Sequence, residues 1–491
     1  MKRFFLWLFG LLGRGWRRPG EVPPPTITRD ILVSRKVSEG DLLQFHGSRR
    51  IQPPTVIVIG VDFGTSCSRV VIRSPYKLRG RAIAVPFDDV GHSSRRYLVP
   101  TQIFVGRDDT VSLVPMPGWT RLQHLKIGLL DRFAQTGNQQ NVITSRDPSA
   151  CAAGYVALVL REARRWFLNT QSESYGDDDI GWELNLGMPS AGYDDSEIRR
   201  EFEAIAEAAW LLSLEPRPLT LQDADNSLGP ARSHRGRANI EAGVVPEVAA
   251  QVVGYAKSHH REEGLHVLVD LGASTLDICS FRLRSDAEGD AYPLLTANVK
   301  RLGLLELHHR RQIATQGRPP FDSVPEDIII GLPDWRPEQF DDPDLRARLY
   351  ECDRQFRTAC VRVLSGAIRD LRRRRDRYSS RWEEGLPIFM CGGGAQSRVF
   401  SEFLRQANRE ATRYWNMKGL INRQMPLPGL LGGDGIMLTE NTVLSRLSVA
   451  YGLSYDRINI GRIEPPGEVP DVPPPPPSGQ PDDVFIGKEQ V

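Results

Sequence analysis

The sequence lacks the features that mark several common classes of protein. No stretch approaches the roughly 18–20 consecutive apolar residues that a helix needs to cross a bilayer. The six cysteines include no Cys-x-x-Cys pair, which argues against a zinc site or a disulfide-stapled secreted scaffold and favours a reducing, cytoplasmic compartment. Net charge is also small, with 63 Lys and Arg against 61 Asp and Glu, so no basic surplus predicts nucleic-acid binding. The strand–loop–helix phosphate motif Gly-x4-Gly-Lys-Ser/Thr is missing as well.

The two ends of the chain differ from its body. Residues 1–20 place five basic residues and no acid around the apolar run Phe4–Leu12. Such a segment could lie on an anionic membrane surface, dock on the protein or a partner, or resemble a signal peptide without a cleavage site. Residues 461–491 contain nine prolines, and six acids against two bases, which predicts an extended or disordered tail that solubilises the chain or docks to a partner protein. We therefore expect an N-terminal extension at 1–50, a folded body at 51–460 and this tail.

The body alternates between strand and helix patterns, which predicts a layered α/β fold. Gly181–Pro189 has a strand pattern, and Asp194–Leu212 has apolar residues at helical spacing behind an acidic start. Gly154–Leu168 is a second predicted helix. The arginine-rich stretch Arg369–Arg381 is expected to be helical, with either a solvated face or an acidic partner.

Two segments of the body share one pattern. Each has an apolar run that ends in Asp-x-Gly, a turn of small and hydroxyl residues, and a second alternating run. The two turns are Asp62–Ser66 and Asp270–Thr275. The pattern predicts two β-hairpins with polar, glycine-bearing tips.

Tips of this kind suit the binding of phosphate and a cation. Successive backbone N–H groups in a turn form a concave site for phosphate oxygens, and glycine allows the chain to approach the anion closely. Asp62 and Asp270 would repel a polyphosphate unless a cation lies between, and Mg2+ suits this role because it keeps waters that carboxylates can hold. A strand followed by three glycines, Leu386–Gly394, could lay its backbone against the same ligand or cap a helix.

The order of these elements resembles the actin-like ATPase superfamily, and most closely the nucleotide-binding domain of DnaK-type heat-shock chaperones. Asp62–Ser66 looks like the first phosphate motif, Asp270–Asp277 like the second and Cys391–Ala395 like the adenosine motif. Further segments are similar in the same order, namely Leu98–Phe104, His124–Gly128, Gly187–Ser190, Cys352–Arg354 and Ser448–Gly452. The resemblance covers about residues 55–455.

The resemblance implies a duplicated ribonuclease-H-like fold of two lobes around a central nucleotide cleft, with lobe I at about 51–245 and 440–460 and lobe II at about 246–439. It also implies a Mg2+-dependent ATPase that acts as a conformational switch on partner proteins. The implied metal-site residues are Asp62 and Asp270. The implied catalytic residues are Lys126, Glu247, Asp270 and Thr275. The implied ATP contacts are Gly64, Thr65, Ser66, Gly272, Ala273, Ser274, Asp353, Gly392, Gly393 and Gly394.

The sequence departs from the family pattern at three points. Glu247 follows Pro246, as the acid does in some plasmid-segregation actin relatives, whereas the family usually places its water-orienting glutamate before the proline. Phe356 stands where the family usually has an adenosine-contacting lysine, which predicts looser base specificity. Only about 35 residues follow the closing motif, too few for the family's peptide-binding sandwich and lid.

Several interpretations stay open at this point. Lys126 could be a surface lysine, Glu247 a helix-capping acid and Asp277 a structural residue. The chain could be a partner-operated ATPase switch, a filament-forming actin relative whose ATP state controls assembly, or a nucleotide-binding scaffold without hydrolysis. A sugar kinase of the same superfamily is disfavoured, because no acid constellation beyond the phosphate motifs suits an acceptor hydroxyl.

Overall fold

The computed structural model describes residues 55–88, 96–133, 146–175, 179–193, 195–233, 241–287, 289–321, 336–415 and 417–472. The predictions of membrane contact for residues 1–20 and of partner docking for the end of the tail fall outside these ranges. Within them the chain is a mixed α/β protein with several sheets, and the two large sheets contain both parallel and antiparallel strands.

The first large sheet is built around the hairpin that carries Asp62. Its strands are β1 (Thr55–Asp62), β2 (Cys67–Arg73), β3 (Ala82–Ala84), β4 (Val99–Pro100), β8 (Ile180–Met188), β9 (Glu241–Pro246) and β15 (Leu430–Leu431). The main order is β15-β3-β2-β1-β8-β9, and β4 pairs with β2. β2 pairs antiparallel with both β1 and β3. On the other side of β1, β8 pairs parallel with β1, and β9 pairs parallel with β8.

The second large sheet is built in the same way around the hairpin that carries Asp270. Its strands are β10 (Gly264–Leu271), β11 (Leu276–Asp286), β12 (Gly289–Lys300), β13 (Leu386–Cys391), β14 (Leu420–Arg423) and β16 (Arg462–Glu464). The order is β14-β13-β10-β11-β12-β16. β10, β11 and β12 are antiparallel neighbours, and β13 and β14 continue parallel to β10. Three antiparallel strands followed by two parallel strands therefore occur in both sheets.

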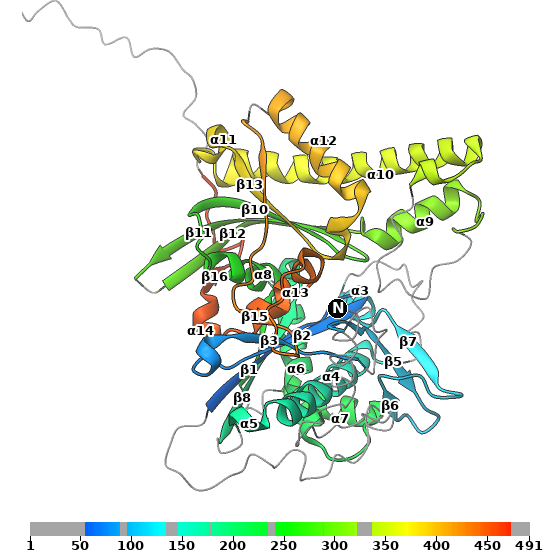
Figure 1. Ribbon diagram of the computed structural model, residues 1–491, viewed down its shortest axis with the longest axis vertical. Helices are drawn as coiled ribbons and strands as arrows, with labels where there is room; N and C mark the ends of the chain where they lie inside the picture. Colours follow the sequence, from blue (N-terminus) through cyan, green and yellow to red (C-terminus); the bar gives the residue numbers. More distant parts are fainter. Residues whose placement is uncertain are drawn as a thin grey trace, which may run out of the picture.

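Helices cover the outer faces of the two sheets, and a pair of helices lies between them (Figure 1). The first sheet is covered by α4 (Pro148–Thr170), α6 (Ser196–Leu214) and α7 (Leu221–Arg232), and the second by α10 (Pro343–Asp370) and α12 (Arg398–Tyr414). The helices between the sheets are α8 (Glu247–Ala256) and α13 (Asn441–Leu453). The remaining helices are α3 (Leu125–Phe133), α5 (Ser172–Tyr175), α9 (Leu304–Ala314), α11 (Arg381–Glu384) and α14 (Arg457–Ile460). A small sheet, in the order β6-β5-β7, comprises β5 (Gln102–Val105), β6 (Val111–Ser112) and β7 (Thr120–Gln123).

Three of the elements that the sequence predicted in this body are confirmed with shifts of their ends. The continuous helix expected over Arg369–Arg381 is not observed, because α10 ends at Asp370, a π-helical turn follows at Leu371–Arg375, and the chain is not helical again until α11 begins at Arg381. The strand predicted at Gly181–Pro189 is β8, and the helix predicted at Asp194–Leu212 is α6. The side chain of Asp195 accepts a hydrogen bond from the backbone of Glu197 at 2.8 Å, which satisfies an otherwise unpaired N–H group at the start of α6. The predicted helix at Gly154–Leu168 is part of α4, which extends further at both ends.

The prediction for the tail differs from the structure at its beginning. Residues 462–464 form β16, which adds parallel to β12, so the ordered body extends beyond the expected boundary at residue 460. The following segment runs along the π-helical turn Leu371–Arg375 that follows α10, where Arg374 and Arg375 each lie 3.1 Å from a carboxylate oxygen of Asp471. The acidic partner considered for these arginines is thus a segment of the same chain.

The helices α8 and α13 cross at very close range. A β-carbon on Gly452 of α13 would overlap the carbonyl oxygen of Ala250 on α8, so only glycine permits this approach. Through its other residues α8 packs against the second sheet, and α13 packs against the first. The crossing therefore fixes the distance between the two sheets.

None of the helices in the described ranges is both long and apolar enough to cross a membrane. All six cysteines are buried and free of disulfide bonds.

We predict that Gly452→Ala lowers the free energy of unfolding by about 2 kcal/mol or more, because the new methyl group must push α13 away from α8. Chemical denaturation measures this loss. The matched control is Gly366→Ala in α10, where an added β-carbon meets nothing within 4 Å and the better helix propensity should be neutral or stabilising by at most about 1 kcal/mol. Equal stability of the two variants would contradict the close crossing.

Candidate functional site

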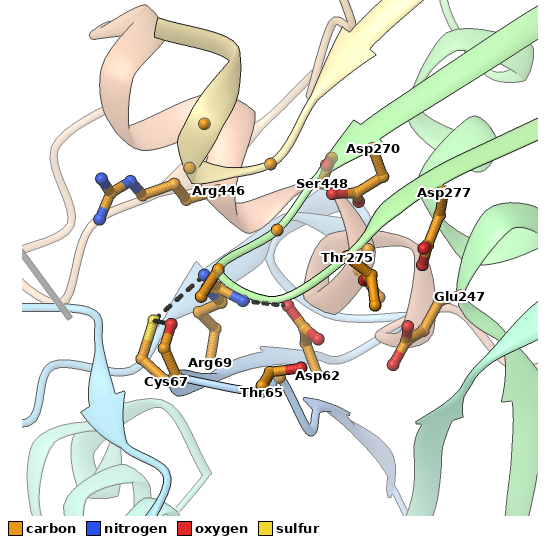
Figure 2. Close-up of a pocket in the computed structure, with 18 of the residues that line it drawn as sticks. Asp62, Thr65, Cys67, Arg69, Glu247, Asp270, Thr275, Asp277, Arg446 and Ser448 are labelled. Carbon is orange, nitrogen blue, oxygen red and sulfur yellow. Dashed lines mark hydrogen bonds and ion pairs between the residues drawn. The ribbon is translucent and has the colours of Figure 1, made fainter. Parts of the chain in front are cut away.

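The two hairpin tips and the glycine loop meet in one cleft between the large sheets (Figure 2). The predicted residues that line it are Asp62, Gly64, Thr65, Ser66, Lys126, Glu247, Asp270, Gly272, Ala273, Thr275, Gly392, Gly393 and Gly394. These residues come from segments far apart in the sequence, and α8 and α13 contribute further residues to the lining.

The first tip is held in place by Thr101, which lies between β4 and β5. Its hydroxyl donates to the carbonyl oxygen of Gly64 at 2.8 Å, and its backbone N–H donates to Ser66 at 3.0 Å. A side chain at Gly64 would collide with the carbonyl of Cys67, so the tight turn requires glycine. The tip is therefore rigid before any ligand binds.

The second tip is held by the start of α9. Backbone N–H groups of Leu304 and Leu305 donate to the carbonyl oxygens of Gly272 and Ala273, at 3.3 and 2.8 Å. The N–H of Gly303 donates to Ser274 at 3.1 Å. These hydrogen bonds engage carbonyl oxygens of the tip, which would otherwise repel an anion. The tip can therefore present its backbone N–H groups to the cleft.

The glycine loop lies directly beside Asp270. Strands β10 and β13 are parallel and pair Asp270 with Cys391, so the residues that follow Cys391 emerge next to the second tip. Gly392 has a φ of 79°, a backbone conformation that favours glycine, and a β-carbon there would overlap Oδ1 of Asp270. The other carboxylate oxygen accepts a hydrogen bond from Gln251 of α8 at 2.9 Å.

Two ion pairs lie in the lining of the cleft. Nζ of Lys126 lies 2.6 Å from Oε1 of Glu247, and both groups are largely buried. Burial alone would lower the pKa of Lys126, but Glu247 and the carboxylates of Asp62 and Asp277 raise it, so the lysine stays charged. The second pair joins Nη1 of Arg69 to Oδ2 of Asp62 at 2.8 Å. Burial would lower the pKa of this arginine, but the neighbouring Cys67 and Asp62 raise it. The interpretation of Lys126 as a surface lysine is therefore wrong, and Glu247 both begins α8 and faces the cleft.

The carboxylates of the cleft lie close enough together to raise one another's pKa. Burial, with the nearby Asp270 and Glu247, raises the pKa of Asp277 to about 7. Its Oδ1 is buried and has no hydrogen-bond partner among the described residues. Burial and the neighbouring Asp62 raise the pKa of Asp270 as well. Four carboxyl groups thus line the cleft against the three cations Arg69, Lys126 and Arg446, and the acids are in excess once Asp277 loses its proton.

This charge pattern fits a hydrated cation. Among the residues that the structure describes, no group of three or more His, Cys, Asp or Glu side chains is arranged to hold a metal ion directly. Mg2+ does not need such a group, since it keeps several waters and usually takes one or two carboxylates plus substrate phosphates. Asp62 and Asp270 line the same cleft and are suited to hold its water shell.

Two predicted contacts lie outside the cleft lining. Asp353 of α10 forms a bidentate ion pair with Arg311 of α9, with both distances at 2.7 Å, so its carboxylate already has a structural partner. Ser274 lies in the second tip, but its hydroxyl is buried and unpaired within the described part of the chain and does not face the cleft.

The sequence did not single out several residues that do line the cleft. These are Cys67, Arg69, Gln251, Leu304, Ser445 and Arg446; Ser448 and Val449 also line the cleft and belong to the family-like segment Ser448–Gly452, to which no site role was given. Arg69 could have been found, because it lies opposite Asp62 in the predicted hairpin register. The residues of α8 and α13 carry no local signal, since the crossing of these helices brings them to the cleft.

Comparison with known proteins adds no identification. No family model matches the chain, and no curated protein is significantly similar to it.

We predict that Asp277→Asn changes the pH dependence of stability, measured with a chelator and without nucleotide. The native carboxyl keeps its proton up to about pH 7, whereas the unfolded chain loses it near pH 4, so the native state binds more protons between these values. The free energy of unfolding of the wild-type protein should therefore fall as the pH rises through this range. An asparagine cannot titrate, and the advantage of the variant over the wild type should grow by about 2 kcal/mol between pH 5 and pH 8.

The control for this experiment is Asp225→Asn, at an exposed position on α7. Its effect on stability should be small and should not change with pH. A difference between Asp277→Asn and the wild type that stays constant from pH 5 to pH 8 would show that Asp277 titrates normally.

Proposed function

We propose that this protein is a Mg2+-dependent ATPase that acts as a conformational switch on partner proteins, and that it belongs with the actin-like ATPases, closest to the nucleotide-binding domain of DnaK-type chaperones. One observation carries the proposal. Two Asp-x-Gly hairpin tips, 208 positions apart (270 − 62), line a single cleft together with a triple-glycine loop. Separate phosphate-binding turns gain a common ligand only when the fold brings them together.

The strand orders of the two sheets support a duplicated ribonuclease-H-like fold with two lobes. The orders β3-β2-β1-β8-β9 and β12-β11-β10-β13-β14 share one pattern of directions, and each central strand carries the aspartate of its hairpin tip at or next to its last residue. A duplication accounts for both similarities at once. In this interpretation the cleft is the space between the lobes, where a nucleotide would touch both.

The ligand we propose is ATP, bound with its phosphates between the tips. Backbone groups of Gly64, Thr65, Gly272 and Ala273 would cradle the phosphates, with the hydroxyl of Thr275 near the terminal one. Asp62 and Asp270 would hold the water shell of Mg2+, which neutralises phosphate charge when it is bound. The flat backbone of Gly392–Gly394 would contact the nucleoside.

Hydrolysis would depend on the buried pair of Lys126 and Glu247. Lys126 is kept charged by its surroundings and is suited to stabilise charge that develops on the terminal phosphate. If Lys126 turns toward the phosphate, Glu247 loses its partner and its carboxylate becomes able to orient a water. Phosphoryl transfer needs mainly such positioning and charge stabilisation.

A second candidate function is a nucleotide-binding scaffold without hydrolysis. The observation that favours it is the 2.6 Å contact between Lys126 and Glu247, which occupies both groups with each other. If that pair persists when nucleotide binds, neither group reaches the reacting atoms. Measured turnover separates the two functions.

The first prediction from this proposal concerns binding. Asp270→Asn should weaken ATP binding in Mg2+ by at least about tenfold, because the proposed water shell loses a charged ligand. Isothermal titration calorimetry with a slowly hydrolysed ATP analogue gives the affinity. Asp225→Asn, the same chemical change on α7, should bind like the wild type, and equal affinity of all three proteins would remove the proposed site.

The second prediction concerns turnover. Lys126→Met should lower kcat for ATP hydrolysis by about 100-fold or more while changing ATP affinity much less, because charge stabilisation acts mainly in the transition state. Steady-state phosphate release measures the rate. If the wild-type protein binds ATP but releases no phosphate, the scaffold function is correct and the ATPase proposal is wrong.

A further inference from the structure

Three of the carboxylates that line the cleft lie at one end of it, and an arginine lies at the other end. Figure 2 shows the carboxylates of Asp270, Asp277 and Glu247 at one end, and the guanidinium of Arg446 at the other, beside the glycine loop. Arg446 belongs to α13, and Arg69 comes from β2 of the first hairpin. Two arginines from separate elements therefore line one cleft, and the function proposed above gives neither of them a role.

Arg446 lies against the backbone of the glycine loop. A β-carbon on Gly393 would be 3.5 Å from Nη2 of Arg446, which is an ordinary van der Waals distance. Ser445 and Ser448 of the same helix also line the cleft, so this face of α13 is polar where it meets the loop. A ligand held on the glycine loop would consequently lie within reach of the guanidinium.

The two arginines raise the positive potential at this end of the cleft. Burial lowers the pKa of Arg446, and the charge of Arg69 lowers it further. Arg69 has Asp62 at 2.8 Å and the sulfur of Cys67 at 3.2 Å, and its Nε is buried without a partner among the described residues. An anion between the two guanidinium groups would relieve their repulsion, and the planar fork of arginine suits phosphate oxygens.

We propose that Arg446 and Arg69 together bind a phosphate group of the ligand and make the cleft selective for nucleotides over nucleosides. The inference rests on the proposed function, because it assumes that the nucleotide lies along the cleft with its terminal phosphate toward the acidic end. In that position the nucleoside lies on the glycine loop, and the phosphate nearest to it lies beside this loop, where Arg446 and Arg69 line the cleft.

The test is calorimetric titration of the full-length protein and its Arg446→Gln variant with ATP, ADP and adenosine, each in Mg2+. Arg446→Gln should weaken ATP and ADP binding about tenfold, or by about 1.4 kcal/mol, and leave adenosine binding unchanged. Arg446→Lys keeps the positive charge but lacks the planar guanidinium group, so it should lose less ATP and ADP affinity than Arg446→Gln. The control Arg409→Gln, on an exposed position of α12, should behave like the wild type.

Two outcomes would overturn the inference. Unchanged ATP affinity in Arg446→Gln shows that the residue does not bind phosphate, and an equal loss for ATP and adenosine shows that it contacts the nucleoside instead. If circular dichroism shows that Arg446→Gln does not fold, Arg446→Lys tests the inference instead. A loss of affinity for ATP but not for adenosine would then support phosphate binding, and an unchanged ATP affinity would contradict it. If the wild-type protein binds no nucleotide, the proposed function is wrong, and titration with inorganic pyrophosphate tests the two arginines separately.

Discussion

The crossing of α8 and α13 is the constraint on which the cleft depends. Each helix packs against a different sheet, and the two approach so closely that Gly452 cannot carry a side chain. Gln251 of α8 then connects the parts, because its side-chain amide donates to Asp270 of the second sheet at 2.9 Å and to Ser448 of α13 at 3.4 Å. The position of the second tip relative to the first is therefore set by helix packing rather than by either hairpin alone. Under the proposed function, a rotation about this crossing would change the opening of the cleft.

Local patterns in the sequence were sufficient for much of the fold. The two hairpins, β8, α4 and α6 each have a periodicity or a cap that can be recognised within about twenty residues, and the structure has them near the predicted bounds. The register of the first hairpin pairs Asp62 with Arg69, a partner that the sequence could have indicated but that was not predicted. The coarse α/β class and many of the candidate residues in the cleft were thus accessible from the sequence.

What could not be predicted depends on contacts between distant segments. Asp353 matches a family motif, yet its carboxylate forms an ion pair with Arg311 of α9. The residues around Asp353 in the sequence do not indicate this partner. Arg446 and Gln251 lie in helices whose amphipathic pattern only marks a buried face, not a ligand. The arginines that follow α10 have the pattern of a solvated surface. In the structure, Arg374 instead pairs with Asp471, which lies 97 positions later in the sequence. In each case the determining interaction is long-range, so local propensity carries no information about it.

The charges in the cleft connect binding of a phosphate to binding of a cation. Asp62 is paired with Arg69, and Glu247 with Lys126, so the charges of each pair largely cancel while the pair stays closed. A phosphate group would attract both cations, and the acids they leave would then favour a metal ion. A phosphate without a metal would meet unpaired carboxylates, and a metal without a phosphate would meet the arginine and the lysine. Under the proposed function, the two ligands would therefore bind cooperatively, since each removes a repulsion that opposes the other.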